Sequence, residues 1–531
     1  MNDYEPVYLR PDIQIEPLID QWYAWSHLIP PATLARNITE RHLKIMDSYI
    51  SAPRVHAAAV KNPKMLGGPF IDYDGKRVDE IRSLREQTIK NRADLINLSS
   101  AIDALGTMLQ QKAKGFSLRP LYEQVPPALR GYVELIYDLN HHPSFRLIEP
   151  LLYQSKFYSD RAQSLMISRT AGDDRPFILS TPRLLNEQSI HVEIPFSSDA
   201  IDELARMKST PKPLPEIKER FEIRRDQERL FESFFTSRPA RRPEPHANPR
   251  ARLRYFGHAC ILVETQGLSL LFDPVISYTY ESETSRYTFE DLPESIDYVV
   301  ITHNHQDHIL FETLLQIRHK VKAIVVPRNS TGALQDPSLK LTLEAIGFKN
   351  VIALGSLESI PFGSGSITGL PFLGEHADLD ITSKQAYLIR IGKRSILFAA
   401  DSSNIEPALY DHIREIVGSI DVLFIGMECD GAPLTWLYGP LLTSRIERSM
   451  DESRRLAGSN CDEGMEVIKR LRCREVYIYA MGQEPWLNHI MNIKYTAESP
   501  PIIESNRLID VCNAQGTTAE RLFGQKEILI T

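Results

Sequence analysis

The stretch Thr302–His308 constrains the fold of this chain more than any other part of the sequence. It reads T-H-N-H-Q-D-H and follows the apolar run Tyr298–Ile301, which predicts a buried strand. The candidate metal ligands that emerge where this strand ends are His303, His305, Asp307 and His308. The first two histidines share one side of the chain, whereas the aspartate and the last histidine lie beyond a turn. Because these groups cannot all face one ion, we predict a site for two metal ions.

The pattern H-x-H-x-D-H directly after a buried strand resembles the metal motif of the metallo-β-lactamase superfamily. That resemblance implies an α/β fold, the αββα sandwich of two packed sheets flanked by helices, with further ligands at later strand ends. A polar loop of solvated histidines is the alternative. The stretches around His258 and Asp273 resemble the opening of the branch that contains phospholipase D-type and lactonase members, in which these two residues shape the pocket floor.

Length and composition describe an acidic protein with more than one domain. Because a domain usually holds roughly 100 to 200 residues, the 531 residues predict two or three domains. A formal charge of -8 makes nucleic acid an unexpected partner. The five cysteines form no C-x-x-C pair, and the chain shows neither a leader peptide nor an apolar run of about 18 residues. We therefore expect a cytoplasmic protein without a membrane partner.

The N-terminal part predicts a mixed α/β domain over residues 1–236. Its first segment, up to about residue 75, is rich in aromatics and prolines and predicts an irregular, well-packed start. A sheet is predicted over residues 131–196, where short apolar runs include Phe177–Ser180 and alternate most clearly at Ser189–Phe196. Helical spacing of apolar residues occurs at Val78–Lys114, Asp199–Met207 and Pro215–Phe235. The stripe of the first helical segment predicts burial in its own domain, with a dimer contact as the alternative.

Residues 237–250 mark a shift in composition. Their four prolines and four arginines predict an extended linker, with a docking patch for an acidic partner as the alternative. Residues 251–531 then predict a regular α/β domain, in which Glu463–Arg472 forms a helix with an acidic first turn. Its predicted strands are Arg252–Phe256, Ile261–Glu264, Leu268–Phe272, Tyr298–Ile301, Ala323–Val326, Ala386–Ile391, Ser395–Ala399, Val422–Gly426 and Glu475–Tyr479.

Two further ligands are expected where later strands end. The run Ser395–Ala400 leads into Asp401, which matches the bridging aspartate of the superfamily. A carboxylate that spans two ions about 3.5 to 4 Å apart is what a dinuclear site requires. The strand Glu475–Tyr479 leads towards His489, the only histidine after His412, and it matches the closing ligand of the second metal.

Two neighbouring residues are candidates for the remaining ligand of the first metal. The segment Leu373–Asp378 reads L-G-E-H-A-D at the place where the superfamily supplies a histidine. Coordination by His376 would give a conventional dizinc site, suited to a hydroxide that attacks an ester or phosphodiester. Coordination by Glu375 would give three carboxylates and four histidines, and the added oxygen donors and negative charge favour iron. The spacing alone favours neither residue.

The whole chain is similar to the diiron β-hydroxylases of chloramphenicol-type antibiotic biosynthesis. The resemblance rests on the aromatic N-terminus, the Pro/Arg linker and two motifs, G-E-H-A-D at Gly374–Asp378 and G-M-E-C-D-G at Gly426–Gly431. It implies two iron sites that share Asp401: one held by His303, His305 and Glu375, the other by Asp307, His308 and His489.

This resemblance also implies an activity and its partners. Two irons would use dioxygen and electrons from an external donor, such as a reductase, to hydroxylate the β-carbon of an aromatic amino acid. The implied substrate is L-4-aminophenylalanine, held as a thioester on the carrier domain of a nonribosomal peptide synthetase. The N-terminal domain would help to form a homodimer and shape the pocket. The alternatives are a dizinc hydrolase of a phosphodiester, lactone or thioester, and a non-catalytic protein that keeps a metal-stabilised scaffold.

Besides the metal ligands, no separate catalytic residue is predicted. His258 and Glu428 are candidates to orient the ligands, and Glu428 follows a buried strand from which it can also line a substrate channel. A structural acid that caps a loop is the alternative for Glu428. Trp436 and Tyr438 are candidates to wall an aromatic substrate, with packing as the alternative for both.

Overall fold

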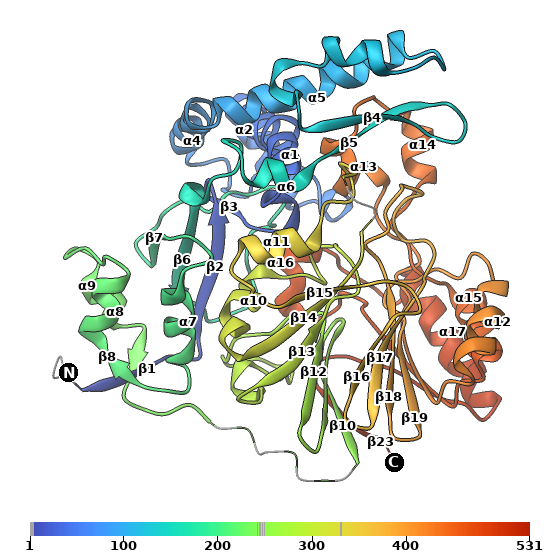
Figure 1. Ribbon diagram of the computed structural model, residues 1–531. Helices are drawn as coiled ribbons and strands as arrows, with labels where there is room; N and C mark the ends of the chain where they lie inside the picture. Colours follow the sequence, from blue (N-terminus) through green and yellow to red (C-terminus); the bar gives the residue numbers. More distant parts are fainter. Residues whose placement is uncertain are drawn as a thin grey trace.

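The computed structural model describes residues 5–530, except for residues 242, 244, 245, 247, 249, 330 and 331. Several positions of the expected linker 237–250 therefore lie outside the described residues. An N-terminal part ends with strand β9 (Phe235–Thr236), and a C-terminal part begins with strand β10 (Ala251–Gly257). Figure 1 shows that the N-terminal part lies over the upper and left sides of the C-terminal part.

Two seven-stranded sheets form the C-terminal part, in the orders β15-β14-β13-β12-β11-β10-β23 and β16-β17-β18-β19-β20-β21-β22 (Figure 1). The first sheet continues from β10 with β11 (Cys260–Thr265), β12 (Leu268–Phe272), β13 (Ile296–Val300), β14 (Val321–Pro327), β15 (Val351–Leu354) and β23 (Lys526–Ile530). The second holds β16 (Ser359–Phe362), β17 (Gly365–Leu370), β18 (Ala386–Ile391), β19 (Arg394–Phe398), β20 (Val422–Gly426), β21 (Glu475–Tyr479) and β22 (Thr518–Arg521).

Apolar side chains of the two sheets meet in one core. Phe272 stacks on Phe398 with ring centroids 4.0 Å apart, and Phe398 stacks on Phe424 at 4.9 Å. Because helices cover the outer faces, the central strands are buried on both sides and read as nearly continuous apolar runs. This double burial is what made the central strands recognisable in the sequence.

Helices flank the sandwich on both sides (Figure 1). The first sheet carries α10 (Phe311–Ile317) and α11 (Leu339–Ala345), and the second carries α12 (Ala408–Val417), α15 (Cys461–Leu471) and α17 (Pro500–Ala514). Helix α15 begins with a capping box, because the Asn460 side chain accepts the Glu463 N–H while the Glu463 carboxylate accepts the Asn460 N–H. Shorter helices are α13 (Leu434–Tyr438), α14 (Arg448–Ser453) and α16 (Asn488–Met491). The expected αββα sandwich is confirmed.

The N-terminal part is mixed α/β, as expected. Its strands are β1 (Pro6–Leu9), β2 (Ile13–Ile19), β3 (Trp22–Tyr23), β4 (Val133–Tyr137), β5 (Pro143–Leu147), β6 (Gln163–Arg169), β7 (Ser189–Glu193), β8 (Lys212–Pro213) and the above β9, paired in the orders β3-β2-β6-β7, β8-β1-β9 and β4-β5. Its helices are α1 (Pro31–Asn37), α2 (Leu43–Ser51), α3 (Pro53–Val60), α4 (Val78–Asn91), α5 (Ala93–Lys112), α6 (Glu149–Tyr153), α7 (Asp199–Arg206), α8 (Leu214–Arg220) and α9 (Glu228–Glu232).

Three local predictions differ from the structure. The first 75 residues are more regular than expected, because β2 pairs along its length with β6. Phe177–Ser180 lies in a turn rather than in a strand, and the predicted helix Pro215–Phe235 is broken into α8 and α9. The break falls at Glu222, which has a positive φ of 48°, a conformation that ends a helix.

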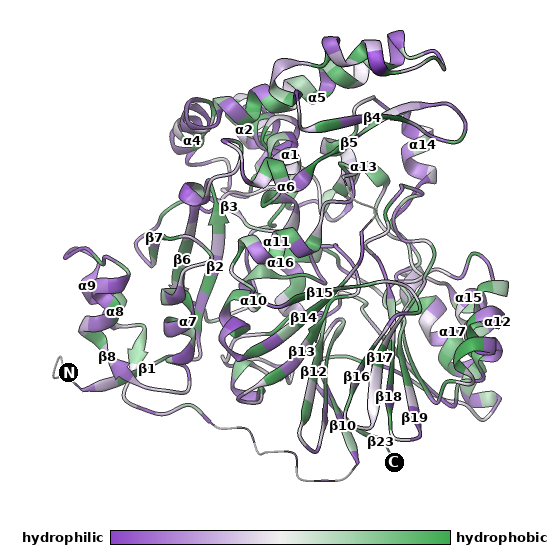
Figure 2. Cartoon of the chain, viewed as in Figure 1, coloured by the Kyte–Doolittle hydropathy of each residue, from purple (hydrophilic) through white to green (hydrophobic). Residues whose placement is uncertain are grey.

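One apolar cluster joins the N-terminal part to the outer face of the first sheet. It contains Trp22 and Leu105 from the N-terminal part together with Phe311 and Leu314 of α10. Figure 2 shows apolar residues along the central strands and polar residues on the outward faces of the peripheral helices. No helix within the described residues is both long and apolar enough to cross a membrane.

Candidate metal centre

The candidate ligands gather at one edge of the sandwich, where several strands end. β12 and β13 run parallel in one sheet, and β19, β20 and β21 run parallel in the other. Because the carboxyl ends of parallel strands meet at one edge, the segments that follow them lie close together. The residues delivered in this way are Asp273 after β12, His303 to His308 after β13, Asp401 after β19 and Glu428 after β20.

Unusual backbone conformations shape this edge. Glu375 has a positive φ of 66°, and His258, Asp273 and Ala400 also lie in the left-handed region. Such conformations are costly for residues with a side chain and cluster at functional sites. Gly426 is required by close approach, because a Cβ there would lie 2.5 Å from Oδ1 of Asp401. The sheet edge is therefore built around the position of the Asp401 carboxylate.

The first group of possible ligands consists of His303, His305 and Glu375, all buried. Oε1 of Glu375 lies 2.7 Å from Nδ1 of His305, and Oε2 lies 3.8 Å from Nε2 of His303. The other nitrogen of His305, Nε2, lies 2.8 Å from the hydroxyl of Tyr438. A hydrogen bond from this nitrogen fixes the tautomer that leaves Nδ1 free to bind a metal.

The second group consists of His303, His308 and Asp401. Nε2 of His308 lies 2.9 Å from Oδ2 of Asp401 and 3.5 Å from Oδ2 of Asp307. On the other side of its ring, Nδ1 lies 2.8 Å from Oδ2 of Asp273. Such a carboxylate behind a histidine orients the ring towards a metal. Asp273 also accepts hydrogen bonds from the backbone N–H and hydroxyl of Thr302, which fix it in place.

Two polar atoms at the centre make no hydrogen bond within the described structure. They are Nε2 of His303 and Oδ1 of Asp401, both buried. Burying polar atoms without hydrogen bonds is costly, so each such atom needs an explanation. Imidazole nitrogens and carboxylate oxygens that converge in this way are the donors of a metal site, so these residues fit metal ions.

The charges at the centre also favour a site for metal cations. Burial opposes the ionisation of Glu375, but His305 and His376 outweigh it and lower its pKa to about 2. Burial, Asp401 and Asp307 together raise the pKa of Glu428 well above its ordinary value. So many carboxylates in one buried site repel one another unless cations balance them.

A third group of possible ligands consists of His258, Asp307 and His308, but the hydrogen bonds of His258 place it to hold a ligand rather than to act as one. Its Nδ1 accepts the backbone N–H of Gly482 at 3.1 Å, so a neutral ring carries its proton on Nε2. That nitrogen lies 2.9 Å from Oδ2 of Asp307, to which it donates. The imidazole therefore orients Asp307, the role expected from the sequence.

His376 belongs to none of the groups of possible ligands. Its ring stacks on that of His305, with centroids 4.5 Å apart and an angle of 26° between the planes. Its Nδ1 lies 2.9 Å from Oε2 of Glu375, so it contacts a possible ligand without joining a group of three. The geometry therefore favours Glu375 over His376 in the choice that the sequence left open.

His489, predicted to close the second metal site, belongs to none of the groups of possible ligands. Nε2 of His489 lies 4.0 Å from Oε2 of Glu312, and its ring packs edge-on against Tyr23. After β21 the chain passes the centre at Gly482, but α16 then carries His489 towards the N-terminal part, where its carbonyl accepts the N–H of Ile178. The sequence shows that a histidine follows the last strand. It does not show the path of the loop that carries this histidine.

The N-terminal part holds the loop around α13 by its backbone. Arg36 donates to the carbonyls of Pro440 and Leu442, and Arg41 donates to those of Trp436 and Leu437. In return, the Trp436 indole N–H donates to the carbonyl of Gly67 at 2.9 Å. Because Tyr438 of the same loop contacts His305, the N-terminal part positions one side of the metal centre. No sequence motif predicted these contacts.

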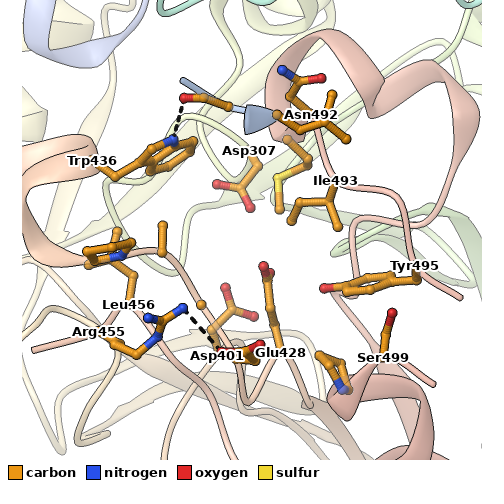
Figure 3. Close-up of a pocket in the computed structure, with 18 of the residues that line it drawn as sticks. Asp307, Asp401, Glu428, Trp436, Arg455, Leu456, Asn492, Ile493, Tyr495 and Ser499 are labelled. Carbon is orange, nitrogen blue, oxygen red and sulfur yellow. Dashed lines mark hydrogen bonds and ion pairs between the residues drawn. The ribbon is translucent and has the colours of Figure 1, made fainter. Parts of the chain in front are cut away.

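A cavity of about 500 Å³ leads to the centre. Its inner wall holds His305, Asp307, Glu375, Asp401 and Glu428. Figure 3 shows the carboxylates of Asp307 and Glu428 facing into this space, between Trp436 on one side and Ile493 and Tyr495 on the other. The hydroxyl of Tyr495 is buried without a hydrogen-bond partner. Trp436 therefore lines the cavity, whereas Tyr438 packs against His305.

Comparison with known proteins explains this combination of parts. Residues 8–239 match the family described as diiron non-heme beta-hydroxylase N-terminal domain, and residues 269–476 match the beta-lactamase superfamily domain. Over 521 residues, 97% of this chain and 98% of the relative, the sequence is 42% identical to the 4-amino-L-phenylalanyl-[CmlP-peptidyl-carrier-protein] 3-hydroxylase of Streptomyces venezuelae. This chain belongs to the diiron non-haem β-hydroxylases.

The solved structures agree with this membership. The crystal structure of CmlA, a diiron β-hydroxylase from Streptomyces venezuelae, has a TM-score of 0.93 at 40% identity and covers 99% of this chain and 100% of its own. A metal-dependent hydrolase from Enterococcus faecalis is 29% identical over only 157 residues, 28% of this chain and 67% of the hydrolase. The family, fold class and iron-dependent oxygenase class expected from the sequence are confirmed, and the hydrolase alternative is not favoured.

Proposed function

We propose that this chain hydroxylates the β-carbon of a 4-amino-L-phenylalanyl group, which a peptidyl carrier domain presents as a thioester. The observation that carries this proposal is the 42% identity, over 97% of the chain, to a relative named for that reaction. In the balanced reaction, dioxygen, two electrons and two protons convert one C–H bond into C–OH and release water.

We assign the metal ligands from the geometry of the two groups. His303, His305 and Glu375 would hold one iron, and Asp307 and His308 would hold the other. Asp401 lies between them, 3.8 Å from Nε2 of His303 and 2.9 Å from Nε2 of His308. Two irons bound there supply the redox chemistry that activates dioxygen with electrons from an external donor.

The chain's own residues orient the ligands and the substrate. Asp273 and His258 fix His308 and Asp307, and Tyr438 fixes His305, so the ligand atoms are held before a metal binds. Trp436, Ile493 and Tyr495 wall the cavity with apolar and aromatic surface next to the centre. An aromatic side chain fits such walls, which would hold its β-carbon beside the carboxylates and exclude water.

Metal analysis of the purified protein, expressed without added zinc, tests this proposal. We expect about two irons per chain, because a dinuclear site binds two ions. The visible absorption should bleach on anaerobic reduction and return with dioxygen. Incubating the reduced protein with dioxygen and the aminoacyl-loaded carrier domain should add 16 mass units, about one oxygen atom, to that carrier. A colourless protein with zinc that releases the amino acid without dioxygen would instead support a hydrolase.

We also propose a homodimer, formed through the N-terminal part. Phe116 is 82% exposed and Leu139 is 100% exposed, and Tyr122 between them is also exposed. Their segments adjoin, because the hydroxyl of Tyr137 donates to the carbonyl of Phe116 and the hydroxyl of Tyr122 accepts the N–H of Leu135. Exposed large apolar side chains on adjoining segments are typical of an interface. Phe116→Glu combined with Leu139→Glu should convert the dimer into monomers in analytical ultracentrifugation, while Leu357→Glu, at an exposed turn of the C-terminal part, should not. A wild-type monomer, or an unaffected variant, would exclude this interface.

We also propose an external electron donor and a location in the cytoplasm. The reaction needs two electrons that the chain's own residues do not supply, so we propose a separate reductase as partner. The five cysteines are free thiols, which fits the reducing cytoplasm.

A further inference from the structure

The cavity that leads to the metal centre has ends of opposite charge. Its inner end carries the four carboxylates of Asp307, Glu375, Asp401 and Glu428. Its outer lining includes Lys64, Lys494 and Arg455, which come from three separate stretches of the chain. A ligand that fits both ends must place a negative group at the mouth and keep negative charge away from the inner end.

The two lysines at the mouth are free to bind such a group. Both are exposed, and neither makes an ion pair or side-chain hydrogen bond in the described structure. Arg455 is paired with Asp430, with 3.1 Å between Nη2 and Oδ1, and both side chains remain partly exposed. The mouth thus carries three cations against one carboxylate, whereas the formal charge of the whole chain is -8. A local positive charge on an acidic protein attracts anions to this place.

The space between the ends suits an uncharged chain. Leu66, Leu456, Met491 and Ile493 line it with apolar surface, together with Trp436. The backbone of Gly67, whose carbonyl is held by the Trp436 indole, forms part of the wall. A cavity of about 500 Å³, with apolar side chains, a basic mouth and an acidic, metal-binding end, therefore has room for a long ligand with one terminal anion.

The arm of a carrier domain has this distribution of charge. Carrier domains hold their aminoacyl groups on phosphopantetheine, which begins with one phosphodiester, continues as a neutral chain of two amides and ends in the thioester. An arm that enters with the aminoacyl group first leaves its phosphodiester at the mouth. This step rests on the proposed function, because it takes a carrier-bound substrate as given.

We propose that Lys64 and Lys494, assisted by Arg455, bind the phosphodiester of the phosphopantetheine arm and so set how far the aminoacyl group reaches into the cavity. Lysines bind phosphate as flexible point charges with several donors, which suits a group that enters and leaves on each turnover. The lysines come from the N-terminal part and from the loop after α16, so the phosphate site spans both parts of the molecule.

The test compares two soluble probes that differ only in the phosphate: the 4-aminophenylalanyl thioesters of 4′-phosphopantetheine and of pantetheine. For the wild-type holoenzyme we expect the phosphorylated probe to bind about tenfold more tightly in calorimetry, as two partly exposed charge contacts predict. That preference should vanish in Lys64→Ala/Lys494→Ala and remain in Lys393→Ala. Lys393 is a matched control, since it is an exposed lysine in the β18–β19 turn, away from the cavity.

Each outcome decides the proposal. Loss of the preference in the double variant alone supports it, and raising the salt concentration should then weaken the wild-type preference as well. A wild type that does not distinguish the probes, or a double variant that still does, overturns it. If the double variant binds both probes like wild type but loses affinity for the intact carrier domain, the lysines contact the carrier's surface and the proposal is also overturned. Failure of the wild type to hydroxylate the loaded carrier would refute the proposed function separately, since the probe affinities do not depend on turnover.

Discussion

Glu375→Ala should leave the protein folded but reduce its bound iron and its hydroxylation rate, the rate by at least about 100-fold. Replacing a residue that only supports a metal ligand typically costs about 10 to 100-fold, and the loss of a ligand itself should cost more. Glu375 is the only carboxylate in the group with His303 and His305, so without it two imidazoles and the shared Asp401 remain for that iron. Iron content by elemental analysis and product formation on the loaded carrier measure the two effects.

The neighbouring histidine provides the matched control. His376 is also buried and its Nδ1 contacts the carboxylate of Glu375, but it belongs to none of the groups of possible ligands. His376→Ala should therefore retain most of its iron, as should His489→Ala, whose side chain lies beside Glu312. Glu375→Gln separates charge from shape, since it keeps the size of the side chain and should still lose iron. Equal losses in the Glu375 and His376 variants would contradict the ligand assignment.

The sequence was sufficient for the parts of the fold whose residues are buried on two sides. Predicted strands Leu268–Phe272, Ala386–Ile391, Val422–Gly426 and Glu475–Tyr479 have the same bounds in the structure. Each is a short apolar run in the middle of a sheet, where burial alone determines the pattern. Strands at or near the sheet edges were missed, because there one face or one edge meets solvent; they are β15, β16, β17, β22 and β23.

Some residues of the candidate site could be predicted from the sequence and others could not, for similar reasons. Asp401 could be predicted because it lies three residues after a buried strand, and His303 to His308 because they form one local motif. The position of His489 could not be predicted in the same way, because it lies ten residues beyond its strand, in short helical turns whose direction depends on tertiary contacts. The left-handed conformations of Glu375 and Ala400 carry no sequence signal either, since non-glycine residues adopt them only when their surroundings force them to.

The N-terminal part is joined to the catalytic part by buried charges as well as by apolar packing. Arg175 lies between two carboxylates, with its Nη2 2.5 Å from Oε1 of Glu16 and 2.7 Å from Oε2 of Glu312. Glu312 also accepts hydrogen bonds from the hydroxyls of Tyr23 and Tyr278. Glu16 and Tyr23 belong to the N-terminal part, whereas α10, which carries Glu312, begins three residues after His308. The network thus links the two parts close to the metal motif.

Arg175→Met should destabilise the protein by about 3 to 5 kcal/mol, because it leaves the buried carboxylate of Glu312 without its arginine, while Glu16 keeps only Arg183. The urea midpoint of the first unfolding transition, followed by fluorescence, measures this loss. Arg175→Met/Glu312→Gln should recover part of it, since the second change removes the negative charge of Glu312. Arg328→Met breaks an exposed ion pair with Glu358 and should cost less than about 1 kcal/mol. If Arg175→Met were no more destabilising than Arg328→Met, apolar packing alone would hold the N-terminal part against the metal domain.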